Sequence, residues 1–118
     1  MSDSFAQQFL DAPDTREALG WLNEDTTGMQ RFLGEGLPAQ QARDFVQGLY
    51  DAGAKQVWVV KIDSYDDGME NSGKMLIELP DDTEQRSEIL LKADEINLSQ
   101  GFDPIEDEGQ RYVFLMLD

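Results

Sequence analysis

The chain has 118 residues, of which 25 are acidic and 9 are basic, and its formal net charge at pH 7 is −16. This length suits one domain with its own core, because 40% of the residues are hydrophobic. A negative field of this strength argues against ordinary nucleic-acid binding and against docking on an anionic membrane, and it favours a basic protein or a divalent cation as partner.

The sequence contains no cysteine and no histidine. This excludes disulfides, thiolate nucleophiles, cysteine-ligated metals, a Ser-His-Asp triad and any histidine-ligated metal. A pair of carboxylates is expected by chance in a chain with 25 acids. We therefore expect no enzymatic activity and no cofactor, with carboxylate- or lysine-based chemistry as the residual alternative.

The amino terminus reads MSDSFAQQFLDAPD and lacks the basic and apolar regions of a secretion signal. No stretch approaches the roughly 18 apolar residues that a membrane span needs. We therefore expect a cytoplasmic protein that does not act on membranes.

Residues 1–25 are predicted to form a helical extension of the main domain. Phe5 and Phe9 lie one helical turn apart, and Asp14 follows a proline in a position to cap a second short helix. Residues 26–118 are predicted to form a single α+β sandwich domain.

The next part of the chain holds one ambiguous segment and one clear helix. Residues 28–33 do not alternate cleanly, but the flanking glycines suit a short strand, so strand and helix both remain open there. After Pro38, apolar residues recur at helical spacing until Gly53 and predict a helix.

Three later segments alternate as strands do. Residues 56–63 and 74–80, joined by the polar loop 64–73, are expected to pair as an antiparallel hairpin. Residues 81–83 then start a helix that continues towards Gly101. The final segment, 111–118, is apolar on both faces, so we expect it to be buried on both sides or to form an interface.

With 28–33 as a strand, the element order is β-α-β-β-α-β. This order predicts a ferredoxin-like sandwich, in which an antiparallel sheet carries two helices on one face. Without that strand, a three-stranded sheet in a related α+β sandwich is expected. The second face of the sheet has apolar candidates such as Val57, Leu76 and Leu115. Because a large bare patch is unusual on a monomer, either the N-terminal helices or a second subunit is expected to cover it.

The loop that begins at residue 63 partly matches a calcium-binding loop. Acids at its first and fifth positions precede a glycine, but Tyr65 and Lys74 stand where ligands are needed, and the loop joins two strands. We expect a solvated hairpin loop and no metal site. The weak candidates for divalent-cation binding are Asp63, Asp66, Asp67 and Glu70.

A second acidic cluster precedes the last strand and consists of Asp103, Glu106, Asp107 and Glu108. Residues 63–118 carry 16 acids and 4 bases, whereas residues 1–62 carry 9 acids and 5 bases. We therefore expect a positively charged partner to dock on the C-terminal half.

Three functional hypotheses follow from these features. The first is a non-enzymatic protein-interaction or regulatory module that binds a protein partner or forms a homodimer. The second is an acidic blocker that imitates nucleic-acid charge and neutralises a basic protein. The third is a domain that binds a divalent cation or a small ligand weakly.

Overall fold

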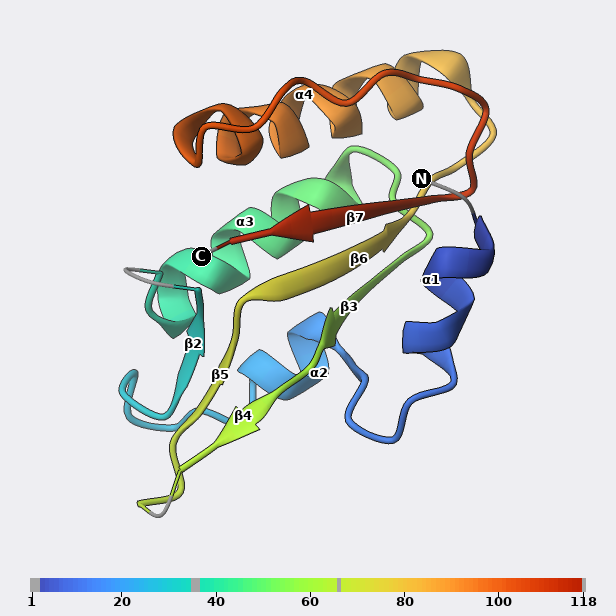
Figure 1. Ribbon diagram of the computed structural model, residues 1–118. Coiled ribbons are helices and arrows are strands. Elements are labelled where there is room, and N and C mark those ends of the chain that lie inside the picture. The colour runs from blue at the N-terminus through green and yellow to red at the C-terminus, as the bar shows by residue number, and fades with distance from the viewer. Residues whose placement is uncertain (1–2, 35–36, 66, 118) are drawn as a thin grey trace.

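The computed structural model describes residues 3–34, 37–65 and 67–117 (Figure 1). Its helices are α1 (Asp3–Leu10), α2 (Ala18–Leu22), α3 (Ala39–Asp51) and α4 (Thr83–Ser99). Its strands are β1 (Arg16–Glu17), β2 (Arg31–Leu33), β3 (Gln56–Val60), β4 (Asp63–Ser64), β5 (Glu70–Ser72), β6 (Lys74–Glu78) and β7 (Tyr112–Met116). None of the helices in these ranges is long and apolar enough to cross a membrane.

The main sheet is antiparallel and has the strand order β1-β3-β6-β7. Side chains alternate between the two faces of a strand. Val57, Ile77 and Val113 lie in register and pack with α2, α3 and α4 in the main core. The neighbouring positions Trp58 and Leu76 face the other way, into a second apolar cluster. The predicted hairpin is therefore confirmed. The last strand contacts apolar side chains on both faces, but Phe114 and Met116 on its outer face are only half-buried.

Helix α1 packs on the second face of the sheet. Ala6 and Phe9 are buried there against Leu76 and other outer-face side chains. The ring of Phe9 stacks on that of Phe114, with the ring centroids 5.1 Å apart. The N-terminal segment thus divides between the two faces, because α1 joins the outer cluster and α2 joins the main core.

Helix α2 is capped by Glu17, and not by Asp14 as the sequence predicted. The Glu17 carboxylate accepts hydrogen bonds from two backbone N–H groups in the first turn of α2. It also accepts a hydrogen bond from the Tyr50 hydroxyl at 2.8 Å, and that hydroxyl accepts the N–H of Val57 at 3.0 Å. Burial, together with Glu17, raises the pKa of Tyr50 to about 12. These bonds tie β1, α2, α3 and β3 together.

Residues 31–33 do form a strand, but this strand does not join the main sheet. A second sheet has the order β2-β5-β4, in which β2 runs parallel to β5. A ferredoxin-like sandwich would place the first strand of the split βαβ unit in the main sheet, whereas here β6 pairs directly with β7. The chain has an α+β fold, and the ferredoxin-like arrangement is not confirmed.

The position of β2 follows from the residues on either side of it. The buried Asp25 carboxylate accepts backbone N–H groups from Thr27, Gly28, Gln30 and Arg31, which folds residues 25–31 into a compact turn before β2. At the other end, Gly34 has φ +70°, and a Cβ atom there would lie 2.5 Å from the carbonyl oxygen of Leu117. Only glycine fits this close approach between the end of β2 and the chain after β7.

The loop predicted for 64–73 is more ordered than the sequence indicated. Most of this loop is a continuation of the hairpin. Strand β4 follows β3, β5 leads into β6, and β4 and β5 pair with each other (Figure 1). Lys61, with φ 54°, lies at the bend between the two sheets. A non-glycine residue in this left-handed region is uncommon and marks a sharp local change of direction.

Candidate interaction groove

A groove runs beside β7, between that strand and the segment 102–110. One cavity of about 310 Å³ is lined by Pro104, Ile105, Glu106, Glu108, Gln110, Tyr112, Val113 and Phe114. A second cavity of about 210 Å³ is lined by Asn97, Phe102, Phe114 and Met116. Because both cavities contact Phe114, they meet at the middle of the strand, and we call the two together the β7 groove.

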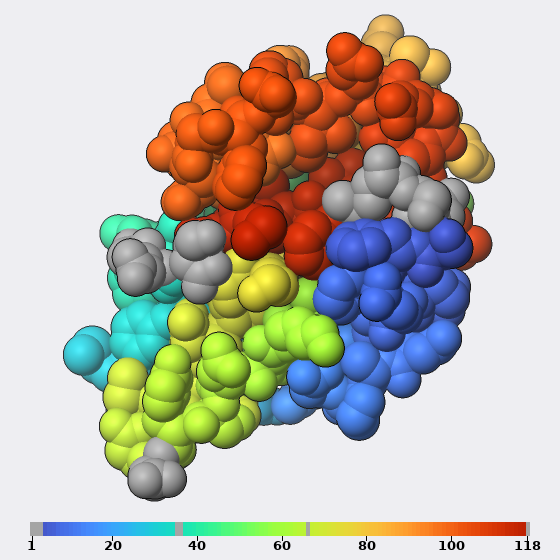
Figure 2. Space-filling model, viewed as in Figure 1, coloured from blue at the N-terminus to red at the C-terminus, as the bar shows by residue number. Residues whose placement is uncertain are grey.

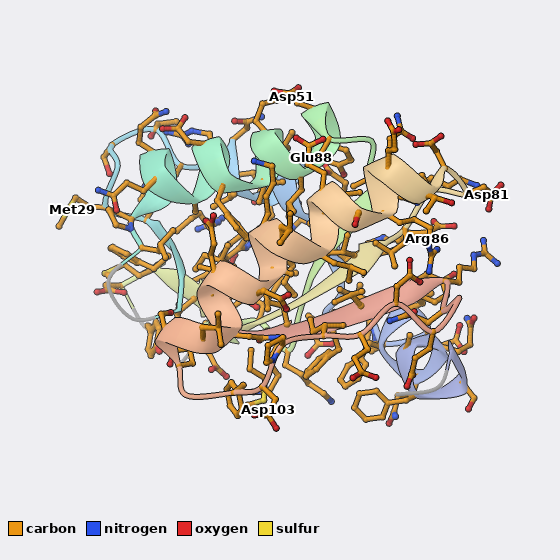
Figure 3. The ribbon with its side chains drawn as sticks, turned by 90° about the horizontal axis from the view of Figure 1, so that it is seen from above. Met29, Asp51, Asp81, Arg86, Glu88 and Asp103 are labelled. Atoms are coloured by element: carbon orange, nitrogen blue, oxygen red, sulfur yellow. The ribbon has the colours of Figure 1, made fainter. Side chains whose placement is uncertain are left out.

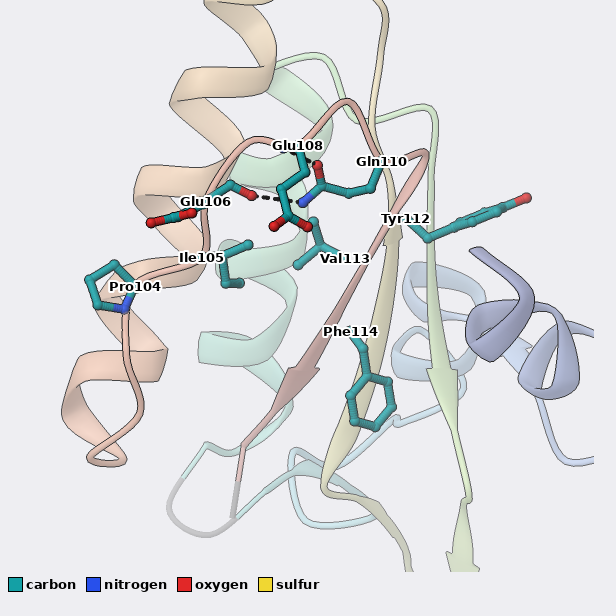
Figure 4. Close-up of a pocket in the computed structure, with 8 residues that line it drawn as sticks. All are labelled: Pro104, Ile105, Glu106, Glu108, Gln110, Tyr112, Val113 and Phe114. Atoms are coloured by element: carbon teal, nitrogen blue, oxygen red, sulfur yellow. Dashed lines mark hydrogen bonds between the residues drawn. The ribbon is translucent and has the colours of Figure 1, made fainter. Parts of the chain in front are cut away.

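The groove lies at the edge of the sheet and not on one of its faces. Val113 belongs to the inner face of β7, whereas Tyr112 and Phe114 belong to the outer face. One cavity touches all three of these consecutive residues, so it must lie beside the strand (Figure 4). In the space-filling view, red atoms of the β7 region are visible at the surface between the orange atoms of the α4 region and the blue atoms of α1 (Figure 2).

The outer wall of the groove is attached to α4. The Arg86 guanidinium contacts the Asp107 carboxylate at 2.6 Å and the carbonyl oxygen of Gln110 at 3.0 Å. The carboxylate of Asp94 accepts the backbone N–H of Ile105 at 2.7 Å. The hydrogen bond from Arg86, with one from a neighbouring backbone N–H, lowers the pKa of Asp107. These bonds hold the wall against the helix.

Uncompensated negative charge lies on the rim of the groove. Glu106 and Glu108 both line the larger cavity, and neither forms an ion pair with any residue that the structure describes. In the close-up, Glu108 turns towards Val113, and Ile105 and Val113 face one another across the gap (Figure 4). An apolar interior with an acidic rim suits a ligand that has both apolar and cationic groups.

This acidic surface continues along the exposed side of α4. Leu91 and Leu98 are 66% and 58% exposed, and they alternate with the exposed acids Glu88 and Glu95. From above, α4 crosses the molecule beside α3, and the chain then turns back, so that Asp103 lies alongside the C-terminal half of α4 (Figure 3). The helix therefore presents a mixed apolar and acidic stripe to solvent.

Carboxylates near α2 and β2 are used within the fold instead. Glu24 forms ion pairs with Arg16 and Arg31, and the hydrogen bonds from Arg16 first and Arg31 second lower its pKa. Glu70 accepts the indole N–H of Trp21 at 3.0 Å and the hydroxyl of Ser64 at 2.9 Å. For Asp25, burial raises the pKa, but its four backbone N–H donors bring the pKa down to about 2.

The candidate metal ligands of the hairpin loop are not brought together. Asp63 is exposed in β4, Asp67 accepts the N–H of Met69, and Glu70 points into the network just described. Asp66 lies outside the described residues. Over the ranges 3–34, 37–65 and 67–117, no group of three or more acidic side chains is arranged to hold a metal ion.

A further cavity of about 410 Å³ opens on the outer face of the second sheet. Its lining comprises Phe32, Gly34, Tyr65, Asp67, Met69 and Asn71. The side-chain oxygen of Asn71 is buried and accepts no hydrogen bond from a described residue. The acids that line this cavity are fewer than those around the β7 groove.

Sequence reasoning identified the acidic cluster 103–108 and the two apolar faces of the last strand, but it did not connect them. Phe102, Ile105 and Gln110 were not recognised as lining residues, because they lie in a segment without periodicity. Contacts with α4, through Arg86, Asp94 and the carbonyl of Asn97, place that segment opposite β7. No protein-family model, curated protein or solved structure matches this chain.

Proposed function

We propose that the protein is a non-enzymatic interaction module that binds a basic protein partner in the β7 groove. The observation that carries this proposal is a groove lined by both apolar and polar side chains, whose rim carboxylates, Glu106 and Glu108, lack ion-pair partners in the described part of the chain. Burial of apolar side chains would supply affinity, and the acidic rim would select and steer a cationic partner. The stripe on α4 would extend the contact.

The carboxyl groups with clear pKa shifts in the described ranges have structural roles. A carboxyl group that acts as a general acid near neutral pH needs a raised pKa. Glu24, Asp25 and Asp107 are the carboxyl groups with clear shifts in the described ranges, and all three shifts are downward. The causes are arginine side chains and backbone donors, which stabilise folded structure.

A displayed library of random dodecapeptides tests the proposal, since such a library covers many candidate partner sequences at once. We expect selection on the wild-type protein to enrich peptides rich in lysine or arginine. Binding of a synthesised selected peptide should weaken as salt increases, because the charges on the rim are exposed. Absence of basic enrichment would overturn the proposal.

Two matched double variants locate the binding surface. Glu106→Gln with Glu108→Gln removes two charges from the groove rim, and Asp44→Asn with Asp51→Asn removes two charges from α3. We expect the first pair to weaken peptide binding about tenfold or more and the second pair to change it less than about twofold, since only the first lines the groove. Equal losses from both pairs would favour the acidic blocker, which depends on total charge.

A further inference from the structure

The outer edge of β7 has backbone groups at Phe114 and Met116 that form no ladder with another strand in the described part of the chain. In an antiparallel pair, alternate residues direct both backbone groups towards the neighbouring strand, and the residues between them direct theirs away. The hydrogen bonds from the N–H of Leu79 to the carbonyl of Arg111, and from the N–H of Leu117 to the carbonyl of Gly73, fix this phase. The backbone groups of Phe114 and Met116 therefore point away from β6.

These outward groups are available for binding. β7 is the last strand of the main sheet, and neither Phe114 nor Met116 has a backbone hydrogen-bond partner on that side among the described residues. Natural proteins usually protect such edges, because an open edge pairs readily with another extended chain. This edge lies along the groove, since both residues line it.

The nearest chain segment does not fill the edge. Residues 102–110 run back beside β7, but the backbone hydrogen bonds in the described chain include none between this segment and β7. Asp94 accepts the N–H of Ile105, and Arg86 donates to the carbonyl of Gln110, so both ends of the segment are bonded to α4. The fold thus keeps an extended segment beside the strand without letting it pair.

We infer that the basic partner adds an extended segment as a further strand on the edge of β7. This inference rests on the proposed function and specifies its binding mode. Backbone hydrogen bonds to Phe114 and Met116 would supply register, and side-chain pockets would supply specificity, as in other cases of strand addition. The segment would be about five residues long, since β7 has five.

The groove also predicts the pattern of side chains in the added segment. Glu106 and Glu108 lie at the end of the groove near Tyr112, so a lysine or arginine is expected there. Phe102 and Met116 line the other end, where an apolar side chain is expected.

A basic segment fits this edge better than a second copy of the chain. Each copy carries a net charge of −16, so two copies repel one another, whereas a lysine- or arginine-rich segment is attracted to the rim. Self-association by pairing of two β7 edges is therefore an outcome that the experiment must detect.

The test compares Met116→Pro with Met116→Val in the full chain. Proline removes the outward N–H and is tolerated on an edge strand, whereas valine keeps the N–H and removes a similar part of the side chain. With the selected basic peptide as probe, we expect Met116→Pro to weaken binding about tenfold relative to Met116→Val, the loss expected for one hydrogen bond. Equal thermal midpoints would show that both variants are folded.

Amide exchange of the wild-type chain provides a second measurement that does not depend on folding of a variant. In the free protein, the amides of Phe114 and Met116 are expected to exchange fast and those of Val113 and Leu115 slowly. The bound peptide should slow exchange at Phe114 and Met116 at least about tenfold. One new hydrogen bond lowers by about this factor the fraction of molecules in which the amide is free to exchange.

The outcomes separate the two proposals. A basic peptide that binds but leaves exchange at Phe114 and Met116 unchanged, with equal affinity for both Met116 variants, overturns strand addition and leaves the interaction module standing. Failure to select any basic peptide overturns both. A dimer of the wild-type chain that Met116→Pro converts to a monomer would assign the edge to a second copy and overturn the choice of a basic partner.

Discussion

Two acidic regions of this molecule use their carboxylates in opposite ways. In the corner formed by α2, β2 and β5, Asp25, Glu24 and Glu70 accept hydrogen bonds from backbone groups, arginines or the indole of Trp21. Along the β7 groove, Glu106 and Glu108 have no ion-pair partner among the described residues, and the outward backbone groups of Phe114 and Met116 also lack a backbone partner there. Acidic residues thus build the fold in one region and remain available for binding in the other.

This contrast shows that net charge alone does not identify a binding surface. Both regions are acidic in the sequence, but an internally bonded carboxylate offers little to a partner, because its hydrogen-bonding capacity is already used. The groove differs because its carboxylates lack ion-pair partners among the described residues. Three measurements test whether the two regions really differ in this way.

The largest effect is expected from Asp25→Ala. This change removes the buried carboxylate that accepts four backbone N–H groups. The residues that supply those N–H groups are half-buried or exposed, so water can replace part of the lost bonding. We expect a loss of about 3 kcal/mol in the free energy of unfolding, measured by urea denaturation. Asp67→Ala is the control, since the exposed Asp67 carboxylate accepts, among the described residues, just the N–H of Met69. Equal losses would show that the four hydrogen bonds accepted by Asp25 do not stabilise the fold.

An intermediate effect is expected on acidification. The folded pKa of Asp25 is about 2, below its ordinary value of 3.8. A depressed pKa means that the folded state binds the proton less tightly than the unfolded state, so its stabilisation is complete above pH 3.8 and is lost as the pH falls towards about 2. The stability difference between wild type and Asp25→Ala should therefore shrink over this interval. A constant difference across it would contradict the role given to Asp25.

The smallest effect is expected from Glu106→Gln combined with Glu108→Gln. Neither carboxylate has an ion-pair partner in the described chain, so no stabilising pair is lost and some self-repulsion is relieved. We expect a rise of no more than about 2 °C in the thermal midpoint, and salt should abolish it. A clear fall in the midpoint would show that the groove acids also stabilise the fold.

Local patterns predicted much of the secondary structure. Helical spacing located α3 and α4, and alternation located β3, β6 and β7, each within a few residues of its observed bounds. The burial of Val57, Val113 and Leu115 also followed from alternation. The start of α2 was predicted at the wrong residue, because Asp14 and Glu17 both lie where a cap can form, and only Glu17 also meets Tyr50.

The sequence by itself determined the absence of cysteine and histidine, the negative charge and the order of the main helices and strands. These properties depend on composition and on the spacing of apolar residues that are close in the chain. Long-range contacts settled the rest. Strand β2 pairs with β5, α1 packs on the outer face, and 102–110 stays on α4 without forming backbone hydrogen bonds to Phe114 or Met116. Each of these depends on residues far apart in the chain, such as Asp94 with Ile105 and Trp21 with Glu70. Their geometry is set by packing and by hydrogen bonds that no local pattern encodes.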